Sequence, residues 1–486
     1  MNKVMRWVIA VVVSLAAFIG LFATQPVHAA DDSLAKVKAK GTIVMGTSPD
    51  YAPYEFLVNK NGKNQVVGID VEIAQKIASD LGVKLVIKQM DFDSLLVGLE
   101  THKVDMVLSA MTPTAERKQS VDFSQIYYTA SQDIIVNKAD LGMYKSAESF
   151  VGKKVGAQTG SMQADLVKQN MPDSKLLGLT KVTDLILALK SHKVEGVVAE
   201  HPVAEAYVQN DSQLALVKSG WKLDPESNGQ AIGFAKGSDA LVAQANKSIS
   251  EIKKQGLIAS YTKTAGKYMT QNTSNTSMWH YWKYFAKGIE YTLLITAISV
   301  VFGVLIGTIM ALLRLGRNKL GHGLAVAYIE FVRGTPLMIQ VMFVYFGIGL
   351  FVDIPALTAG IIAVSLNSAA YVAEIIRSGI DSIPVGQTEA ARSLGLSTRQ
   401  TMTSVVLPQA IRNIWPALGN EFISLIKESS IVSIIGVTDL IYQLKVVQTA
   451  TYKGVAPIFV AMMLYFIMTF SLSKVLGHFE KRMAHK

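Results

Sequence analysis

The residues that could carry chemistry in this chain are suited to holding an anion. Arg117 offers a planar guanidinium fork that matches a carboxylate through two parallel hydrogen bonds, although a solvated surface arginine is the alternative. Gly160-Ser161-Met162 opens a predicted helix after a strand, where backbone N–H groups attract anions, but many strand-to-helix turns look the same. No GxxxxGK[ST], HExxH or GxSxG motif occurs, the eight His are scattered and Cys is absent. We therefore expect no ATP hydrolysis, no metal site, no cofactor and no catalytic residue on this chain.

Short apolar strands alternate with amphipathic helices from residue 31 to about residue 267. The predicted strands are residues 42–46, 83–88, 104–109, 154–157 and 194–199. The predicted helices are residues 71–81, 92–101, 164–170, 184–191 and 240–255. This alternation predicts α/β lobes with mostly parallel sheets, whose ligands bind beyond the carboxyl ends of the strands.

The second half of the chain is apolar enough to cross a bilayer several times. Spans at about 284–313, 324–352, 357–377, 414–437 and 455–476 can each cover about 30 Å of hydrocarbon. Lys and Arg follow the first and third spans and end the chain, which by the positive-inside rule places these three regions in the cytoplasm. This distribution explains the net charge of +10 without nucleic acid. The predicted fold class is an α/β two-lobed domain followed by an all-α transmembrane domain of five helices.

The two ends of the α/β domain have compositions of their own. Residues 1–29 have the basic start, apolar stretch and small-residue cleavage site of a secretory signal peptide, with an uncleaved anchor as the alternative. The polar run QNTSNTS at 271–277 lacks apolar periodicity, which predicts a flexible linker. The predicted boundaries are a signal peptide at 1–29, the α/β domain at 30–267, a linker at 268–283 and the transmembrane domain at 284–486.

Three stretches of the α/β domain together carry a family likeness. GTSPDYAPYEF, GIDVEIAQKIASDLG and KVDMVLSAMTPTAERKQSVDFSQIYY resemble the periplasmic-type solute-binding proteins for polar amino acids. The resemblance covers the whole domain and implies two lobes, joined by two crossing strands, that close on an amino acid. The first lobe would comprise residues 31 to about 130 and 225–267, and the second about 136–220.

The same resemblance implies which residues hold the backbone of the amino acid. Arg117 would clamp the carboxylate. The assisting residues would be Thr112, the backbone around Ser109 and Ala110, and the turn at Ser161 and Met162. For the ammonium the family usually has an aspartate, whereas this chain has Glu200, whose extra methylene would alter the lobe closure or the pose. A carboxylate favoured by a helix start is the alternative for Glu200.

The resemblance also indicates a subsite for the ligand side chain. The residues at positions that sandwich or select the side chain are Tyr51, Phe92, Ser48 and Gln158, although Phe92 could equally be plain core. Ser48 stands where binders of basic amino acids often carry an acid, which Asp50 or Glu55 could still supply. We favour a neutral polar ligand such as glutamine, with basic amino acids next; the sequence does not name the amino acid.

A second likeness lies in the transmembrane half. The stretch EAARSLGLSTRQTMTSVVLPQA, within a loop at 384–412, resembles the EAA loop of ATP-binding-cassette (ABC) importer permeases, with an ordinary basic loop as the alternative. The stretches FVRGTPLMIQ and SLNSAAYVAEIIRSGIDSIPVGQTEAA further resemble amino-acid permeases. The likeness implies a short cytoplasmic helix–turn–helix that docks on a separate ATPase; Gly395 would permit the turn and Pro408 could start the next helix. The expected coupling residues are Glu389, Ala390, Ala391, Gly395, Leu407 and Pro408.

Three charged residues fall in the fourth span. They are Glu421, Lys427 and Glu428. A charge within a span normally pairs or faces water. These residues could line the translocation path, or they could lie near the cytoplasmic end as packing and snorkelling groups, and the sequence favours neither position.

The two resemblances together imply a receptor fused to its permease, as one subunit of an ATP-driven importer for polar amino acids. Fusion would keep the receptor near the membrane at an effective concentration of order millimolar. Five spans are too few to enclose a pathway, so we expect a homodimer with two ATPase subunits that use the ATP. The binding domain would be extracellular and the C-terminus cytoplasmic. An amino-acid-gated channel would need a pore inside the binding domain and a filter such as TVGYG, and a cell-wall lytic enzyme would need a catalytic domain.

Overall fold

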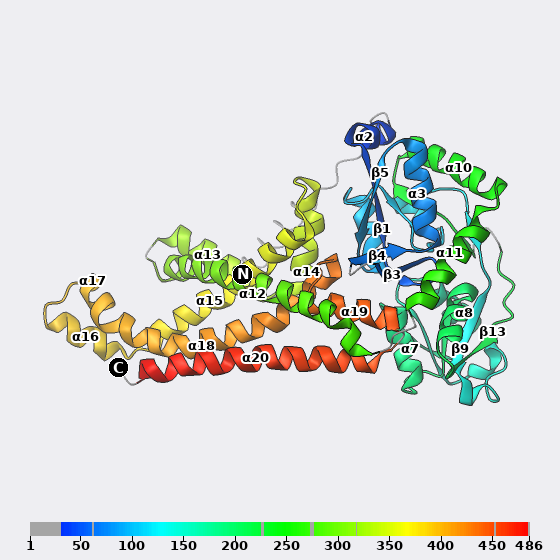
Figure 1. Cartoon of the computed structure of the whole chain (residues 1–486). Helices are drawn as coiled ribbons and strands as arrows, with labels where there is room; N and C mark the ends of the chain where they lie inside the picture. Colours follow the sequence, from blue (N-terminus) through cyan, green and yellow to red (C-terminus); the bar gives the residue numbers. More distant parts are fainter. Residues whose placement is uncertain are drawn as a thin grey trace, which may run out of the picture.

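The structure is a computed structural model that describes residues 31–60, 63–224, 228–272, 277–316, 318–451 and 453–484. The predicted signal peptide lies outside the described residues. Figure 1 shows an α/β part at one end, the binding domain, and a bundle of long helices that extends away from it, the transmembrane part.

The first lobe of the binding domain is built on a sheet in the order β5–β1–β6–β15–β7. The strands are β1 (Thr42–Thr47), β5 (Lys84–Gln89), β6 (Met106–Val107), β7 (Val121–Phe123) and β15 (Gly233–Ala235). The helices are α2 (Ser33–Lys40), α3 (Ile69–Leu81), α4 (Leu95–Glu100), α5 (Arg117–Ser120), α10 (Asp239–Lys254) and α11 (Leu257–Asn272), with a 3₁₀ turn η1 (Phe92–Ser94). A small sheet of β2 (Asp50–Tyr51), β3 (Glu55–Lys60) and β4 (Lys63–Val67) is added.

The second lobe repeats this plan with a sheet in the order β11–β10–β12–β9–β13. The strands are β9 (Gln132–Asn137), β10 (Lys154–Gln158), β11 (Lys175–Leu179), β12 (Gly196–Glu200) and β13 (Leu214–Lys218), and the helices are α6 (Met162–Asn170), α7 (Val182–Lys190) and α8 (His201–Asn210). β8 (Tyr128–Thr129) and β14 (Gly229–Gln230) pair antiparallel where the chain crosses between the lobes. The predicted two-lobed α/β fold is confirmed.

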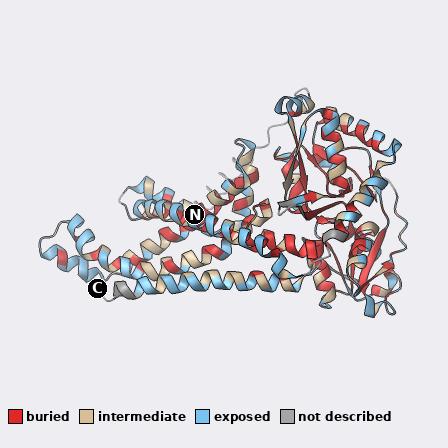
Figure 2. Ribbon diagram, in the orientation of Figure 1, coloured by how far each residue is buried: buried red, intermediate tan, exposed pale blue. Residues whose placement is uncertain are grey.

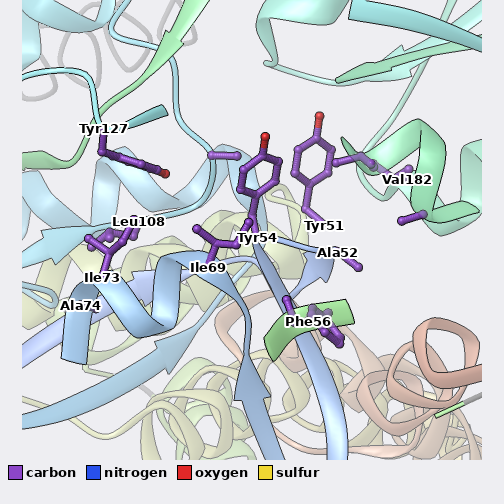
Figure 3. Close-up of a cluster of buried hydrophobic side chains, with 14 of the residues drawn as sticks. Tyr51, Ala52, Tyr54, Phe56, Ile69, Ile73, Ala74, Leu108, Tyr127 and Val182 are labelled. Atoms are coloured by element: carbon purple, nitrogen blue, oxygen red, sulfur yellow. The ribbon is translucent and has the colours of Figure 1, made fainter. Parts of the chain in front are cut away.

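The central strands are buried on both faces, as expected for parallel strands covered by helices. Along β1, Ile43 and Met45 belong to one apolar cluster and Val44 to another, on the opposite face. The first cluster includes Tyr51, Tyr54 and other residues of the close-up in Figure 3. Each lobe therefore presents a rigid sheet edge toward the other lobe.

The transmembrane part consists of helices that differ in length and in burial. They are α12 (Trp282–Leu315), α13 (Lys319–Arg333), α14 (Leu337–Met342), α15 (Ala356–Asp381), α16 (Val385–Ser393), α17 (Thr398–Thr401), α18 (Leu407–Glu428), α19 (Leu440–Thr451) and α20 (Val455–Ala484). Among the described residues, three helices are long and apolar enough to cross a membrane, or up to five spans if each of two bent pairs counts as one. Figure 2 shows α20 largely exposed, and its exposed side chains include Phe459, Phe466 and Phe470, as lipid contact requires.

Two of the five predicted spans are bent pairs of helices. In the span predicted at 324–352, α13 and the helix that follows it bend by 108°, because Gly334 and Pro336 interrupt the backbone hydrogen bonds. In the span predicted at 414–437, α18 stops at Glu428, a 3₁₀ turn follows, and α19 leaves at 56°. The predicted flexible linker also differs, since α11 continues to Asn272 and α12 begins at Trp282.

The binding domain rests on one end of the transmembrane part. The Lys103 ammonium of the first lobe lies 2.9 Å from Oδ1 of Asp353, in the loop before α15. Tyr442 of α19 donates its hydroxyl hydrogen to the side-chain oxygen of Gln89. Figure 1 places α16 and α17 at the opposite end of the helices from the binding domain.

Candidate functional site

A cavity lies between the two lobes, at the carboxyl ends of their parallel strands. It is lined by Ser48, Asp50, Tyr51, Glu55, Phe92, Ser109, Ala110, Thr112 and Arg117 of the first lobe and Gln158, Ser161, Met162 and Gln163 of the second. Every residue that the sequence predicted to contact a ligand lies in this lining except Glu200. The lobes thus bring together residues that are far apart in the chain.

The strand ends of the first lobe are tied to one another at the cavity. Ser48 follows β1 and Ser109 follows β6, and the Ser48 N–H donates to Ser109 Oγ over 3.2 Å. Ala110 adopts a positive φ of 46°, and its N–H donates to the Asp70 carboxylate at 2.8 Å. The loop after β6 is therefore held in one conformation before any ligand arrives.

Arg117 reaches across the cleft at one end of the cavity. Its Nη1 donates to the Thr112 carbonyl and its Nη2 to the Gly160 carbonyl of the second lobe, each at 2.7 Å. The guanidinium also stacks on Phe92, with Cζ 5.4 Å from the ring centroid. Burial lowers the pKa of Arg117 to about 10, which leaves the group charged at neutral pH. No side-chain carboxylate is in ion-pair contact with Arg117 in the part of the chain that the structure describes, so its charge remains for a ligand.

The turn before α6 faces Arg117 from the second lobe. Ser161 caps α6, because its Oγ accepts from the Ala164 N–H at 3.3 Å and donates to the Gln158 carbonyl at 2.7 Å. Met162 and Gln163 form the first turn of this nine-residue helix and line the cavity. An anion held by Arg117 would therefore also meet the positive end of a helix.

Tyr51 and Phe92 form the aromatic part of the lining, as predicted for a side-chain subsite. Figure 3 shows Tyr51 beside Tyr54 with both hydroxyl groups pointing the same way, and Val182 of the second lobe close to Tyr51. The two tyrosine rings are nearly parallel, with centroids 6.0 Å apart. The ring of Tyr51 is thus held rigid by its neighbour.

Glu200 lies outside the lining, although it is fully buried at the end of β12. Its N–H donates to the Tyr51 hydroxyl at 3.4 Å, and its carboxylate accepts from the Gln230 side-chain amide. Burial raises the pKa of Glu200 to about 8. The structure therefore places this carboxyl next to a lining residue rather than in the lining itself.

Two other carboxyl groups do line the cavity. Glu55 accepts from the Ser109 hydroxyl at 2.7 Å, and burial together with the charge of Asp70 raises the pKa of Glu55 well above its usual value. Asp50 is paired with Lys181, whose Nζ lies 3.3 Å from Asp50 Oδ1. The sequence suggested Asp50 and Glu55 only as possible acids, and it gave no signal for Lys181 or Gln163, whose places depend on contacts across the cleft.

The EAA loop has the helix–turn–helix form that the resemblance implied. α16 ends in a turn at which Gly395 has a φ of +84° and the Leu396 N–H donates to the Ala391 carbonyl at 3.2 Å. A capping box of Ser397 and Gln400 then starts α17. Pro408 is in the first turn of α18, but α18 continues α17 through a π-helical turn at Met402–Val406, so Pro408 does not start a new helix as predicted. Of the predicted coupling residues, Glu389, Ala390, Gly395 and Pro408 are exposed, Leu407 is half-buried and Ala391 is buried.

The charged residues of the fourth span lie toward the other end of α18. Lys427 and Glu428 are exposed where α18 stops, whereas Glu421 is half-buried within the helix. The chain then reaches Gly436, which lies against the Gln89 carbonyl of the binding domain. Lys427 and Glu428 therefore lie at the end of α18 that is nearer the binding domain, and both predicted roles stay predictions.

Comparison with known proteins accounts for both halves of the chain. Residues 43–270 match bacterial extracellular solute-binding proteins, family 3, and residues 303–485 match the binding-protein-dependent transport system inner membrane component. The arginine-binding extracellular protein ArtP of Bacillus subtilis (strain 168) is 40% identical over 220 residues, which is 45% of this chain and 83% of ArtP. A Rickettsia bellii protein named for glutamine transport, the permease GlnP, is 39% identical over 202 residues, which is 41% of this chain and 93% of GlnP.

A solved structure resembles the binding domain as well. It is an amino acid ABC transporter substrate-binding protein from Streptococcus pneumoniae bound to L-arginine, 36% identical, with a TM-score of 0.47 over 48% of this chain and 98% of that one. The first family match covers the α/β binding domain, and the second covers the helical transmembrane part. The chain belongs to family 3 of the bacterial extracellular solute-binding proteins and, in its C-terminal half, to the inner membrane components of binding-protein-dependent transport systems.

Proposed function

We propose that this chain is the substrate-binding and membrane-spanning subunit of an ATP-driven importer for polar amino acids, with glutamine first and basic amino acids next. The observation that carries the proposal is the cavity between the lobes, where a charged arginine and a helix start face two carboxyl groups. A free amino acid has the complementary charges, because a carboxylate and an ammonium group are both attached to its Cα atom. The relatives ArtP and GlnP are named for arginine binding and for glutamine transport, which supports the same class.

The polar ends of the cavity suit the backbone of an amino acid. The unpaired guanidinium of Arg117 and the first turn of α6 would hold the carboxylate. Glu55 in the lining and Glu200 behind Tyr51 are the carboxyl groups available for the ammonium. Both groups have raised pKa values. A bound ammonium would favour their ionised forms, so ligand binding would release a proton from a carboxyl group to the solvent.

The side-chain end of the cavity favours a neutral ligand. The carboxylate of an amino acid would balance the charge of Arg117, and its ammonium would balance one ionised carboxyl group. The other acid in the lining, Asp50, is already paired with Lys181. The aromatic surfaces of Tyr51 and Phe92 and the amides of Gln158 and Gln163 would then contact an uncharged polar side chain. These features support glutamine ahead of arginine as the proposed ligand.

The transmembrane part supports an assembly with separate ATPase subunits. The EAA loop presents Leu394, which is 83% exposed, at the tip of its turn, as a surface for a partner would require. Two copies of this chain would form the pathway and dock two ATPase subunits, which hydrolyse ATP. Because α16 and α17 lie opposite the binding domain (Figure 1), an extracellular binding domain puts the EAA loop in the cytoplasm.

Titration calorimetry of the purified full-length chain with each of the twenty common amino acids tests the proposal. We expect glutamine to bind most tightly, with other polar or basic amino acids weaker and large apolar ones not at all. A folded chain that binds none of the twenty would refute the amino-acid assignment.

A further inference from the structure

Lys181 is a buried lysine that the proposed ligand contacts leave unused. It directly precedes α7 in the second lobe and is only 5% exposed. Its Nζ lies 2.8 Å from Ser48 Oγ, 3.3 Å from Asp50 Oδ1 and 3.1 Å from Asp91 Oδ1. These three partners all belong to the first lobe, so the ammonium crosses the cleft.

Asp50 receives further contacts on both of its oxygens. The N–H of Val182, also in the second lobe, donates to Oδ2 at 3.3 Å, and the Ser48 hydroxyl donates to Oδ1 at 2.8 Å. Ser48 and Asp50 are themselves in the cavity lining. The lysine therefore neutralises an acid that would otherwise face the ligand.

Two lysines and three acids interact around this point; the third acid is the half-buried Asp184 of α7, whose pKa is raised by burial. Asp50 and Asp91 contribute two carboxylates, while Lys181 and Lys445 of α19, which lies 3.8 Å from Asp91 Oδ2, contribute two ammonium groups. Burial by itself would lower the pKa of Lys181, but the charges of Asp50 and Asp91 raise it above the usual value, so the ammonium persists at neutral pH. A cationic ligand side chain would therefore find Asp50 already paired with Lys181.

We propose that Lys181 is a specificity-determining residue whose ammonium occupies, from within the protein, the place at Asp50 that a cationic ligand side chain would take. The cavity then accepts neutral side chains and disfavours arginine and lysine. This inference rests on the proposed amino-acid function and adds the residue that sets its selectivity. Because the bonds of Lys181 run between the lobes, the residue also favours the closed arrangement in which the selection is made.

The test is the binding of L-glutamine and of L-arginine to the purified full-length chain, measured by calorimetry. Lys181→Met leaves Asp50 without a cation, so the ratio of the arginine to the glutamine dissociation constant should fall by about tenfold or more. Adding Asp50→Asn removes the freed acid and should return this ratio to within about threefold of the parent value.

The matched control is Lys76→Met, the same change in an ion pair with Asp80 on the surface of α3. It should leave both affinities as they are. An unchanged ratio in Lys181→Met overturns the inference, and so does loss of both ligands from a variant that still unfolds cooperatively, because Lys181 would then only fasten the lobes. If the parent chain itself binds neither amino acid, the proposed function fails, and the parent titration alone reveals this.

Discussion

Arg117 is a single side chain that forms hydrogen bonds to both lobes at the cavity. Arg117→Ala would leave a ligand carboxylate unpaired and would also remove the bond to the Gly160 carbonyl across the cleft. We expect a cost of about 2–5 kcal/mol, or an affinity about thirtyfold to several-thousandfold weaker. Titration calorimetry measures this loss. Lys118→Ala, at the exposed neighbouring position, is the control, and an Arg117→Ala chain that binds like this control would exclude Arg117 from the site.

Glu200 should make the stability of the ligand-free protein depend on pH. Its pKa rises from 4.5 to about 8 in the folded state, so between these values the folded chain keeps a proton that the unfolded chain releases. Stability should therefore fall as the pH increases through this window. In Glu200→Gln the fall in melting temperature between about pH 5 and pH 8 should be smaller, as thermal unfolding would show. Equal slopes for parent and variant would mean that Glu200 is ionised throughout.

How much of the site the sequence predicts depends on how local each signal is. Ser48, Ser109 and Arg117 lie in stretches that carry the family resemblance, so their positions at the cavity could be predicted from it. Lys181 could not, because its role comes from partners in the other lobe, and a lysine before a helix is usually solvated. Glu200 was predicted as a contact, but the distance between the lobes decides whether a carboxyl group reaches the cavity, and this distance is a property of the fold.

Among the elements, the turn of the EAA loop offers a test of coupling. Gly395→Val places a β-branched side chain at a φ of +84°, at a cost of about 1–3 kcal/mol in that turn. A Cβ there meets no atom within 4 Å, so the strain is confined to the backbone. With the ATPase partner in vesicles, amino-acid binding should be normal while ligand-stimulated ATP hydrolysis and uptake fall together.

The matched control for this change is Gly386→Val, in the same loop. Gly386 is also exposed and open around its Cβ position, but it lies in α16 with a φ outside the left-handed region. Uptake should survive in Gly386→Val. Equal uptake in the two variants would mean that the conformation of the turn at Gly395 is not needed for coupling ATP hydrolysis to transport.

Element boundaries were predictable where short-range signals decide them. The turn at Gly395 follows from residue type and was found, whereas the helix predicted to start at Pro408 already begins at Thr398, because α17, a π-helical turn at Met402–Val406 and α18 follow one another without a break. The bend between α13 and α14 was missed because the average hydropathy stays high through Gly334 and Pro336. A high average hydropathy shows only that a segment is apolar. Whether the segment stays one straight helix depends on backbone hydrogen bonds, and proline has no N–H to donate to them.

At the scale of the whole molecule, the contact between the two parts can be weakened at one ion pair. Asp353→Asn leaves the Lys103 ammonium, which is 3% exposed, without its carboxylate, although the Ile354 carbonyl remains 3.4 Å away. We expect docking of the binding domain to weaken by about 1–3 kcal/mol. Asp381→Asn changes an acid near the EAA loop, away from the contact, and is the control.

The absence of native cysteine makes this measurement direct. One cysteine at exposed Lys84 and one at exposed Lys319 would carry a donor and an acceptor dye, and a lower transfer efficiency in Asp353→Asn would report undocking. Identical efficiencies in both variants would show that the ion pair is incidental. The sequence predicted two fused parts from their compositions, but it could not predict this contact, which joins residues 250 positions apart.

Helix α12 runs unbroken for 34 residues, a rod of about 51 Å. Near its start a Cβ at Gly288 would meet the backbone of Leu440, beneath the binding domain, and near its end Arg314 pairs with Glu374. About two-thirds of the way along, Gly303 and Gly307 allow α15 to approach most closely. One unbroken helix therefore connects the contact beneath the binding domain with the ion pair of Arg314 and Glu374 at its other end, and it packs most closely against α15 between these two points.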